Sequence, residues 1–98
     1  MLTLDRDALA AISRAHNVQR LVLFGSAATT AFDPETSDAD FIVEFIPGSA
    51  TPFEDYFNLK AELEALLGRP VDLLSASRIE NPYLAASVAE TAVEIYAA

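Results

Sequence analysis

Residues 23–45, LFGSAATTAFDPETSDADFIVEF, contain the features that decide the fold. Residues 20–24 (RLVLF) form a compact run of β-favouring residues that stops at Gly25-Ser26, and residues 40–45 (DFIVEF) form a second, nearly all apolar run. Runs of this length and composition are typical of strands that are buried on both faces. The quoted stretch therefore predicts two buried strands joined by a polar loop.

The flanking segments alternate between helical and extended patterns. Residues 4–15 carry apolar side chains at helical spacing, residues 51–67 begin with Thr-Pro and repeat leucines on one face, and residues 70–74 form a third apolar run. Residues 81–98 begin with Asn-Pro and repeat apolar side chains at helical spacing, which predicts a last helix. The predicted order is α-β-β-α-β-α, an α/β (α+β) fold in which helices pack against a small mixed sheet.

Composition limits the class of protein. A chain of 98 residues, of which 52% are hydrophobic, has enough apolar side chains for one modest core, which predicts a single domain over residues 1–98. The absence of cysteine excludes disulfide scaffolds, zinc–thiolate sites and thiol nucleophiles, and it fits a reducing compartment. No apolar stretch approaches membrane-spanning length, so we expect a soluble, cytoplasmic protein.

The net charge restricts the partners. A formal charge of −9 would repel the phosphate backbone of a nucleic acid, which argues against direct nucleic-acid binding and favours a basic protein partner. For the same reason, a nucleoside triphosphate could lie beside these carboxylates only if divalent cations lay between them. If ATP binds to this protein, we expect metal ions to bind with it.

An Asp-x-Asp pair lies at the start of the second predicted strand. If Asp38 and Asp40 belong to one extended segment, both side chains point to the same face while Ala39 points away. Mg²⁺ prefers one or two carboxylates together with water and substrate phosphates, so such a pair suits a nucleotide-bound metal. Asp72, in the third apolar run, could supply another carboxylate from a neighbouring strand, and metal coordination would offset the cost of burying its charge.

The Gly25-Ser26 pair directly follows a predicted strand. Glycine lets the backbone turn sharply so that successive N–H groups can face a phosphate, and the serine hydroxyl adds one more donor. Each feature alone has an ordinary alternative, because Gly-Ser is a common turn, an acidic turn can precede a strand, and Asp72 can lie on an exposed strand edge. The order of these features along the chain is what suggests a combined site.

In that order the residues resemble a known family. LFGSAATTAFDPETSDADFIVEF is similar to the signature of the minimal nucleotidyltransferases of the DNA polymerase β-type superfamily, and residues 81–98 resemble their usual final helix. The resemblance covers nearly the whole chain and implies a nucleotidyltransferase fold. It also suggests an antitoxin of the minimal nucleotidyltransferase (MNT) type, which would act by transferring AMP to a tyrosine of a HEPN-domain toxin.

The resemblance also implies a site and a mechanism. AMP would move from ATP to a hydroxyl group with the help of two Mg²⁺ ions, and pyrophosphate would leave. The catalytic and metal-binding residues would be the triad Asp38, Asp40 and Asp72. The phosphates of the nucleotide would contact Gly25 and Ser26.

The sequence departs from the family pattern beside the phosphate turn. Many relatives carry arginines after Gly-Ser, where this chain has Ala27 and Thr29, so positive charge would have to come from Arg20, Arg69, Arg78 or a partner. This departure and the acidic charge leave a second hypothesis open: a catalytically inactive module of the same fold that neutralises a basic partner by binding alone. A third is an ordinary acidic α/β domain whose aspartates only look like a triad.

Two further expectations concern side chains outside the site. We expect His16 to lie near the end of the first helix, where an imidazole can interact with free backbone carbonyls. We expect the aromatic residues Phe53, Tyr56 and Phe57 of the 51–67 helix to pack in the core rather than bind adenine.

Overall fold

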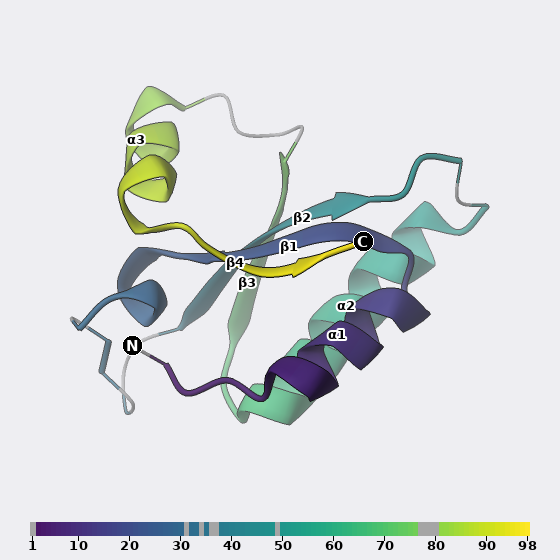
Figure 1. Ribbon diagram of the computed structural model, residues 1–98, viewed down its shortest axis with the longest axis horizontal. Helices are drawn as coiled ribbons and strands as arrows, with labels where there is room; N and C mark the ends of the chain where they lie inside the picture. Colours follow the sequence, from purple (N-terminus) through teal and green to yellow (C-terminus); the bar gives the residue numbers. More distant parts are fainter. Residues whose placement is uncertain (1, 31, 34, 36–37, 49, 77–80) are drawn as a thin grey trace.

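The computed structural model describes residues 2–30, 32, 33, 35, 38–48, 50–76 and 81–98 (Figure 1). Within these residues the strands form one sheet in the order β3-β2-β1-β4, in which β1 is antiparallel to β2 and β4, and β2 is parallel to β3. The predicted α/β class with a small mixed sheet is confirmed. The elements are α1 (Arg6–Ala15), β1 (Val18–Phe24), the 3₁₀ helix η1 (Gly25–Ala28), β2 (Ala39–Phe45), α2 (Pro52–Leu67), β3 (Val71–Ser75), α3 (Pro82–Thr91) and β4 (Val93–Ala97).

The end of the chain differs from the prediction. The last helix ends at Thr91 instead of continuing, and Val93–Ala97 pairs with β1 as a fourth, edge strand. Ala92 leaves the helical conformation with a ψ of 129°. The predicted helix to residue 98 is wrong because the apolar side chains of this segment also alternate with a period of two, and pairing with β1 selects the strand.

Helices α1 and α2 cover one face of the sheet (Figure 1). Alternate residues of a strand point to the same face, so every second side chain of the two central strands reaches these helices. The side chains packed there are buried and form the main core. They include Leu21, Leu23, Phe41 and Val43 of the strands, Leu9 of α1, and Leu59 and Leu63 of α2.

Helix α3 lies on the opposite side of the sheet from α1 and α2 (Figure 1). Its residues Leu84 and Val88 pack on a second, smaller cluster that contains Val22, Phe24 and Ile42. These strand residues are the ones that alternate with the residues of the main core. The two faces of β1 and β2 are therefore both apolar over part of their length, as the compact apolar runs predicted.

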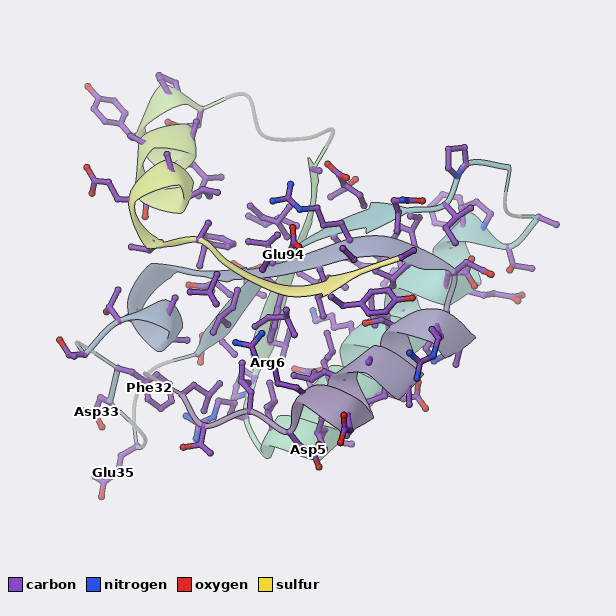
Figure 2. All side chains as sticks on the ribbon, viewed as in Figure 1. Asp5, Arg6, Phe32, Asp33, Glu35 and Glu94 are labelled. Atoms are coloured by element: carbon purple, nitrogen blue, oxygen red, sulfur yellow. The ribbon has the colours of Figure 1, made fainter. Side chains whose placement is uncertain are left out.

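Helix side chains occupy backbone groups of both edge strands. The Val71 N–H of β3 donates to the Glu64 carboxylate at 3.1 Å, and the Tyr56 hydroxyl of α2 donates to the Leu73 carbonyl at 2.6 Å. On the other edge, the Arg6 guanidinium of α1 donates to the Glu94 carbonyl of β4 at 3.1 Å (Figure 2). Edge strands with open backbone groups can pair with other chains, and these contacts reduce that exposure.

Helix α2 begins at Pro52, where the sequence predicts, and a buried carboxylate in its first turn holds this end of the helix. The Thr51 hydroxyl donates to the buried Asp55 carboxylate at 3.3 Å instead of capping the helix, and the Asn17 amide donates to the same carboxylate at 3.2 Å. Asn17 adopts a left-handed φ of 59° just after His16, which ends α1 as its C-cap residue, as expected. The imidazole of His16 contacts Glu62 of α2, so the two helices are joined at this end.

The aromatic side chains of α2 divide between core and surface. Tyr56 packs against the main core, as predicted. Phe53 and Phe57 are 79% and 62% exposed, so the expectation that they are core residues is wrong. Both line an open pocket together with Phe45 of β2 and Leu73 of β3. None of the helices among the described residues has the length and hydrophobicity of a membrane-spanning segment.

Candidate functional site

The predicted site residues come together at one end of the sheet. β1 ends there, and β2 and β3 both begin there, because β2 runs antiparallel to β1 and parallel to β3. The strand register places Phe24 opposite Asp40, and Asp40 opposite Asp72. Gly25 directly follows Phe24. The structure therefore brings the phosphate turn and two of the three aspartates together from three different strands.

The half-buried Asp40 is the central carboxylate of this group. Its neighbours Ala39 and Phe41 point into the main core, so Asp40 projects to the other face of the sheet, the face on which α3 packs. Burial raises the pKa of Asp40 above its ordinary value of 3.8, and the negative charges of Asp72 and then Asp38 raise this pKa further. All three aspartates are therefore close enough to interact electrostatically, and a divalent cation would relieve their repulsion.

The aspartates fit a magnesium site in chemical type and in neighbourhood. Carboxylate oxygens are the hard ligands that Mg²⁺ prefers, and the exposed Asp38 and Asp72 flank the half-buried Asp40. Among the residues that the structure describes, however, no three His, Cys, Asp or Glu side chains are arranged to hold one ion together. Assignment of the three aspartates as metal ligands therefore stays a prediction.

Gly25 is required at its position for two reasons. Its φ of +72° lies in the left-handed region, and a Cβ atom built on it would lie 2.9 Å from Oδ2 of Asp40. The turn therefore packs its backbone directly against the central carboxylate. The Gly25 N–H donates to the Thr91 hydroxyl at 2.8 Å, so in this structure it is used within the protein rather than offered to a ligand.

The turn after Gly25 is closed by Thr29, a polar residue where the resemblance leads us to expect a basic one. Gly25–Ala28 forms the single turn of η1, and both the N–H and the hydroxyl of Thr29 donate to the Ser26 carbonyl, at 3.0 Å and 3.1 Å. Ser26 itself is only partly buried. Thr29 thus serves to close the turn and supplies no positive charge there.

The three arginines considered as replacements lie in different surroundings. Arg20 pairs with Glu94 of β4 at 2.9 Å, and Arg78 lies outside the described residues. The guanidinium of Arg69 lies 4.7 Å from the ring centroid of Phe32, which belongs to the loop between η1 and β2 (Figure 2). Of the two candidates that the structure describes, Arg69 is therefore the one that contacts the loop joining the phosphate turn to the aspartates.

Thr91 and Phe32 were not predicted as site residues. Thr91 lies 66 positions after Gly25, and only the packing of α3 on η1 brings the two together. Phe32 lies within a polar loop, and its sequence context does not indicate that it meets Arg69. Neither residue carries a local signal, because each acquires its role from a contact that is distant in sequence.

Comparisons with known proteins agree with this geometry. The family described as "Polymerase beta, Nucleotidyltransferase" matches residues 8–98. A protein of Methanocaldococcus jannaschii that carries the name "Putative protein adenylyltransferase" is 36% identical over 80 residues, which cover 82% of this chain and 79% of that protein.

Solved structures show the same fold. One, described as a "putative minimal nucleotidyltransferase", is 35% identical, superposes with a TM-score of 0.69, and is matched over 90% of this chain and 86% of its own. The fold is also shared, at 19% identity and a TM-score of 0.62, with a complex of a tri-AMPylated Shewanella oneidensis HEPN toxin and its MNT antitoxin; that match covers 95% of this chain and 70% of the other. The chain belongs to the polymerase β-type nucleotidyltransferase family, which confirms the resemblance carried by residues 23–45.

Proposed function

We propose that this protein is a Mg²⁺-dependent adenylyltransferase that moves AMP from ATP to a hydroxyl group. The observation that carries the proposal is the packing of Gly25 against the Asp40 carboxylate, with Asp72 opposite Asp40 in the register. A turn suited to phosphates and a set of hard ligands thus meet at one place. Membership of the family and the name of the M. jannaschii relative support the reaction class.

Each residue of the site has a role in this proposal. Asp38, Asp40 and Asp72 would hold Mg²⁺, which when bound would separate the carboxylates from the triphosphate and polarise the phosphoryl oxygens. Asp72, which is exposed, would also orient or deprotonate the attacking hydroxyl. The absence of a side chain at Gly25 lets phosphate approach the backbone, and the Ser26 hydroxyl would donate a hydrogen bond to it. Positioning and charge neutralisation then carry most of the catalysis.

We further propose that the acceptor is a tyrosine of a HEPN-type toxin and that the protein acts as its antitoxin in the cytoplasm. The shared fold with the MNT antitoxin of S. oneidensis, which was solved in complex with an AMPylated HEPN toxin, supports this partner. The charge of −9 suits a basic protein partner and opposes direct contact with nucleic acid.

A catalytically inactive binding module is the second candidate. It is favoured by the residues after the phosphate turn, where Ala27 and Thr29 replace the arginines of many relatives and Thr29 serves to close the turn. A protein that had lost the charge needed for ATP could still neutralise a partner by occupying its surface.

The double substitution Asp38→Asn with Asp40→Asn separates the two candidates. It removes two metal ligands while nearly preserving their shape, so the protein should fold and bind its partner but lose Mg²⁺-dependent transfer of label from [α-³²P]ATP to the protein encoded beside its gene. A matched control, Asp7→Asn with Glu54→Gln, removes two exposed charges on α1 and α2 and should keep transfer. If the first variant still protected cells from the toxin without labelling it, the binding module would be the correct function.

A further inference from the structure

Thr91, the last residue of α3, is hydrogen-bonded to the phosphate turn. Its hydroxyl accepts the Gly25 N–H at 2.8 Å and donates to the Ser87 carbonyl, one helical turn earlier, at 2.7 Å. Both the donor and an acceptor position of this hydroxyl are therefore in use at a partly buried position. The result is a continuous chain of hydrogen bonds from the backbone of α3 to the first residue of η1.

The helix itself sets the direction of this hydroxyl. A threonine in a helix is restricted at χ1, and one of its two preferred rotamers lets Oγ1 bond the carbonyl four residues earlier. The hydrogen bond to the Ser87 carbonyl selects that rotamer for Thr91, so contacts within α3 already orient Oγ1 toward the turn. The acceptor for the Gly25 N–H is thus preorganised by α3.

The position of Gly25 leaves little room for movement toward the aspartates. A Cβ atom there would already lie 2.9 Å from Oδ2 of Asp40, so the turn packs against the carboxylate on one side and is held by Thr91 on the other. Misplacement of reacting groups by even about 1 Å can cost roughly 100-fold in rate. The group that holds Gly25 in place therefore helps to set the geometry of the candidate site.

We propose that Thr91 is a positioning residue for nucleotide transfer, which holds the Gly25-Ser26 turn against Asp40 without touching the nucleotide or the metal. This inference rests on the proposed function, because it assigns Thr91 a role in that same site. It predicts that removing the hydroxyl impairs the site while the two cores of the sheet, to which Thr91 does not belong, remain intact.

Thr91→Val removes the hydroxyl with little change in shape, and Thr91→Ser retains it. In Thr91→Val we expect amide hydrogen exchange at Gly25, measured by NMR, to accelerate at least ~10-fold and the Kd for ATP with Mg²⁺, measured by calorimetry, to rise roughly 10-fold. Thr91→Ser should restore both quantities to within about 3-fold of wild type. If the valine variant folds poorly, Thr91→Ala repeats the test with a good helix former. As a control, Glu90→Gln changes an exposed neighbour in the same helical turn and should alter neither the exchange rate at Gly25 nor the Kd for ATP.

The two measurements have separate meanings. Unchanged amide exchange at Gly25 in Thr91→Val would show that the hydrogen bond does not hold the turn. Faster exchange with unchanged ATP affinity would show that Thr91 is only a structural residue. Either result overturns the inference while the proposed function stands. Wild-type protein that binds no ATP in the presence of Mg²⁺ would overturn the proposed function itself, and the positioning role with it.

Discussion

The two faces of the sheet have been used for different purposes. The face under α1 and α2 is covered along the central strands, and its side chains, such as Phe41, are completely buried. The face under α3 has a small apolar cluster around Ile42 and then, at the next position on that face of β2, the half-buried Asp40. The seven-residue strand β2 thus supplies a core residue, Ile42, and a site residue, Asp40, at neighbouring positions on the same face.

The difference shows how a small chain can carry a charged site without losing its core. Side chains alternate across a strand, so Asp40 can approach Asp72 and Asp38 on one face while both its neighbours stabilise the other. Substitutions on the two faces should therefore differ in how much they lower stability and in whether they also affect the site.

The largest effect is expected for Phe41→Ala, which should lower the free energy of unfolding by about 3–5 kcal/mol because the fully buried ring leaves a cavity between the sheet and two helices. Ile42→Ala on the other face should cost about 2–3 kcal/mol, since α3 covers that cluster incompletely and can close part of the gap. Urea unfolding of both variants measures the difference. An equal or greater loss for Ile42→Ala would contradict the division between the faces.

An intermediate effect is expected at the junction of turn and carboxylate. Gly25→Ala should lower the free energy of unfolding by about 1–3 kcal/mol and also impair ATP binding, because the new Cβ atom is strained at a φ of +72° and meets Asp40 at 2.9 Å.

Gly48 is the matched control for this substitution. Its φ is +86°, yet a Cβ atom there would meet nothing within 4 Å, so Gly48→Ala should show the backbone strain alone, about 1 kcal/mol, with ATP binding intact. Equal losses in the two variants would mean that contact with Asp40 contributes nothing.

The smallest effect is expected for Asp40→Asn, and it should depend on pH. The folded protein holds the Asp40 proton more tightly than the unfolded chain does, because the pKa is raised above 3.8. Wild-type stability should therefore fall as pH rises through the interval between 3.8 and the raised pKa. Asp40→Asn removes this loss, so without metal it should be more stable than wild type at neutral pH, and the advantage should vanish well below pH 3.8.

Thermal unfolding across this pH range, with exposed Asp7→Asn as control for the loss of a carboxylate, tests the prediction. Added Mg²⁺ should raise the Tm of wild type more than that of Asp40→Asn, because a ligand of the folded state stabilises it by mass action. A stability advantage of Asp40→Asn that grew as the pH fell would show that the carboxylate is stabilised, rather than destabilised, by its surroundings.

Local chemistry determined much of this protein from the sequence alone. Two compact apolar runs separated by Gly-Ser and Asp-x-Asp predicted two central strands and the turn between them, because strand propensity, the left-handed φ of glycine and the alternation of side chains depend on only a few neighbouring residues. The same alternation predicted that Asp40 and Ala39 point to opposite faces, and the third apolar run suggested Asp72 as a carboxylate from a neighbouring strand.

Only the tertiary structure decided the remaining features, because each depends on what a segment meets. Residues 93–97 have apolar side chains compatible with either a helix or a strand, and pairing with β1 selects the strand. Phe53 and Phe57 are as apolar as core residues but remain mostly exposed to solvent. Thr91 reaches Gly25 across 66 positions of sequence. Periodicity within a segment is a local property, whereas strand pairing, burial and the acceptor of a distant N–H are set by packing between segments.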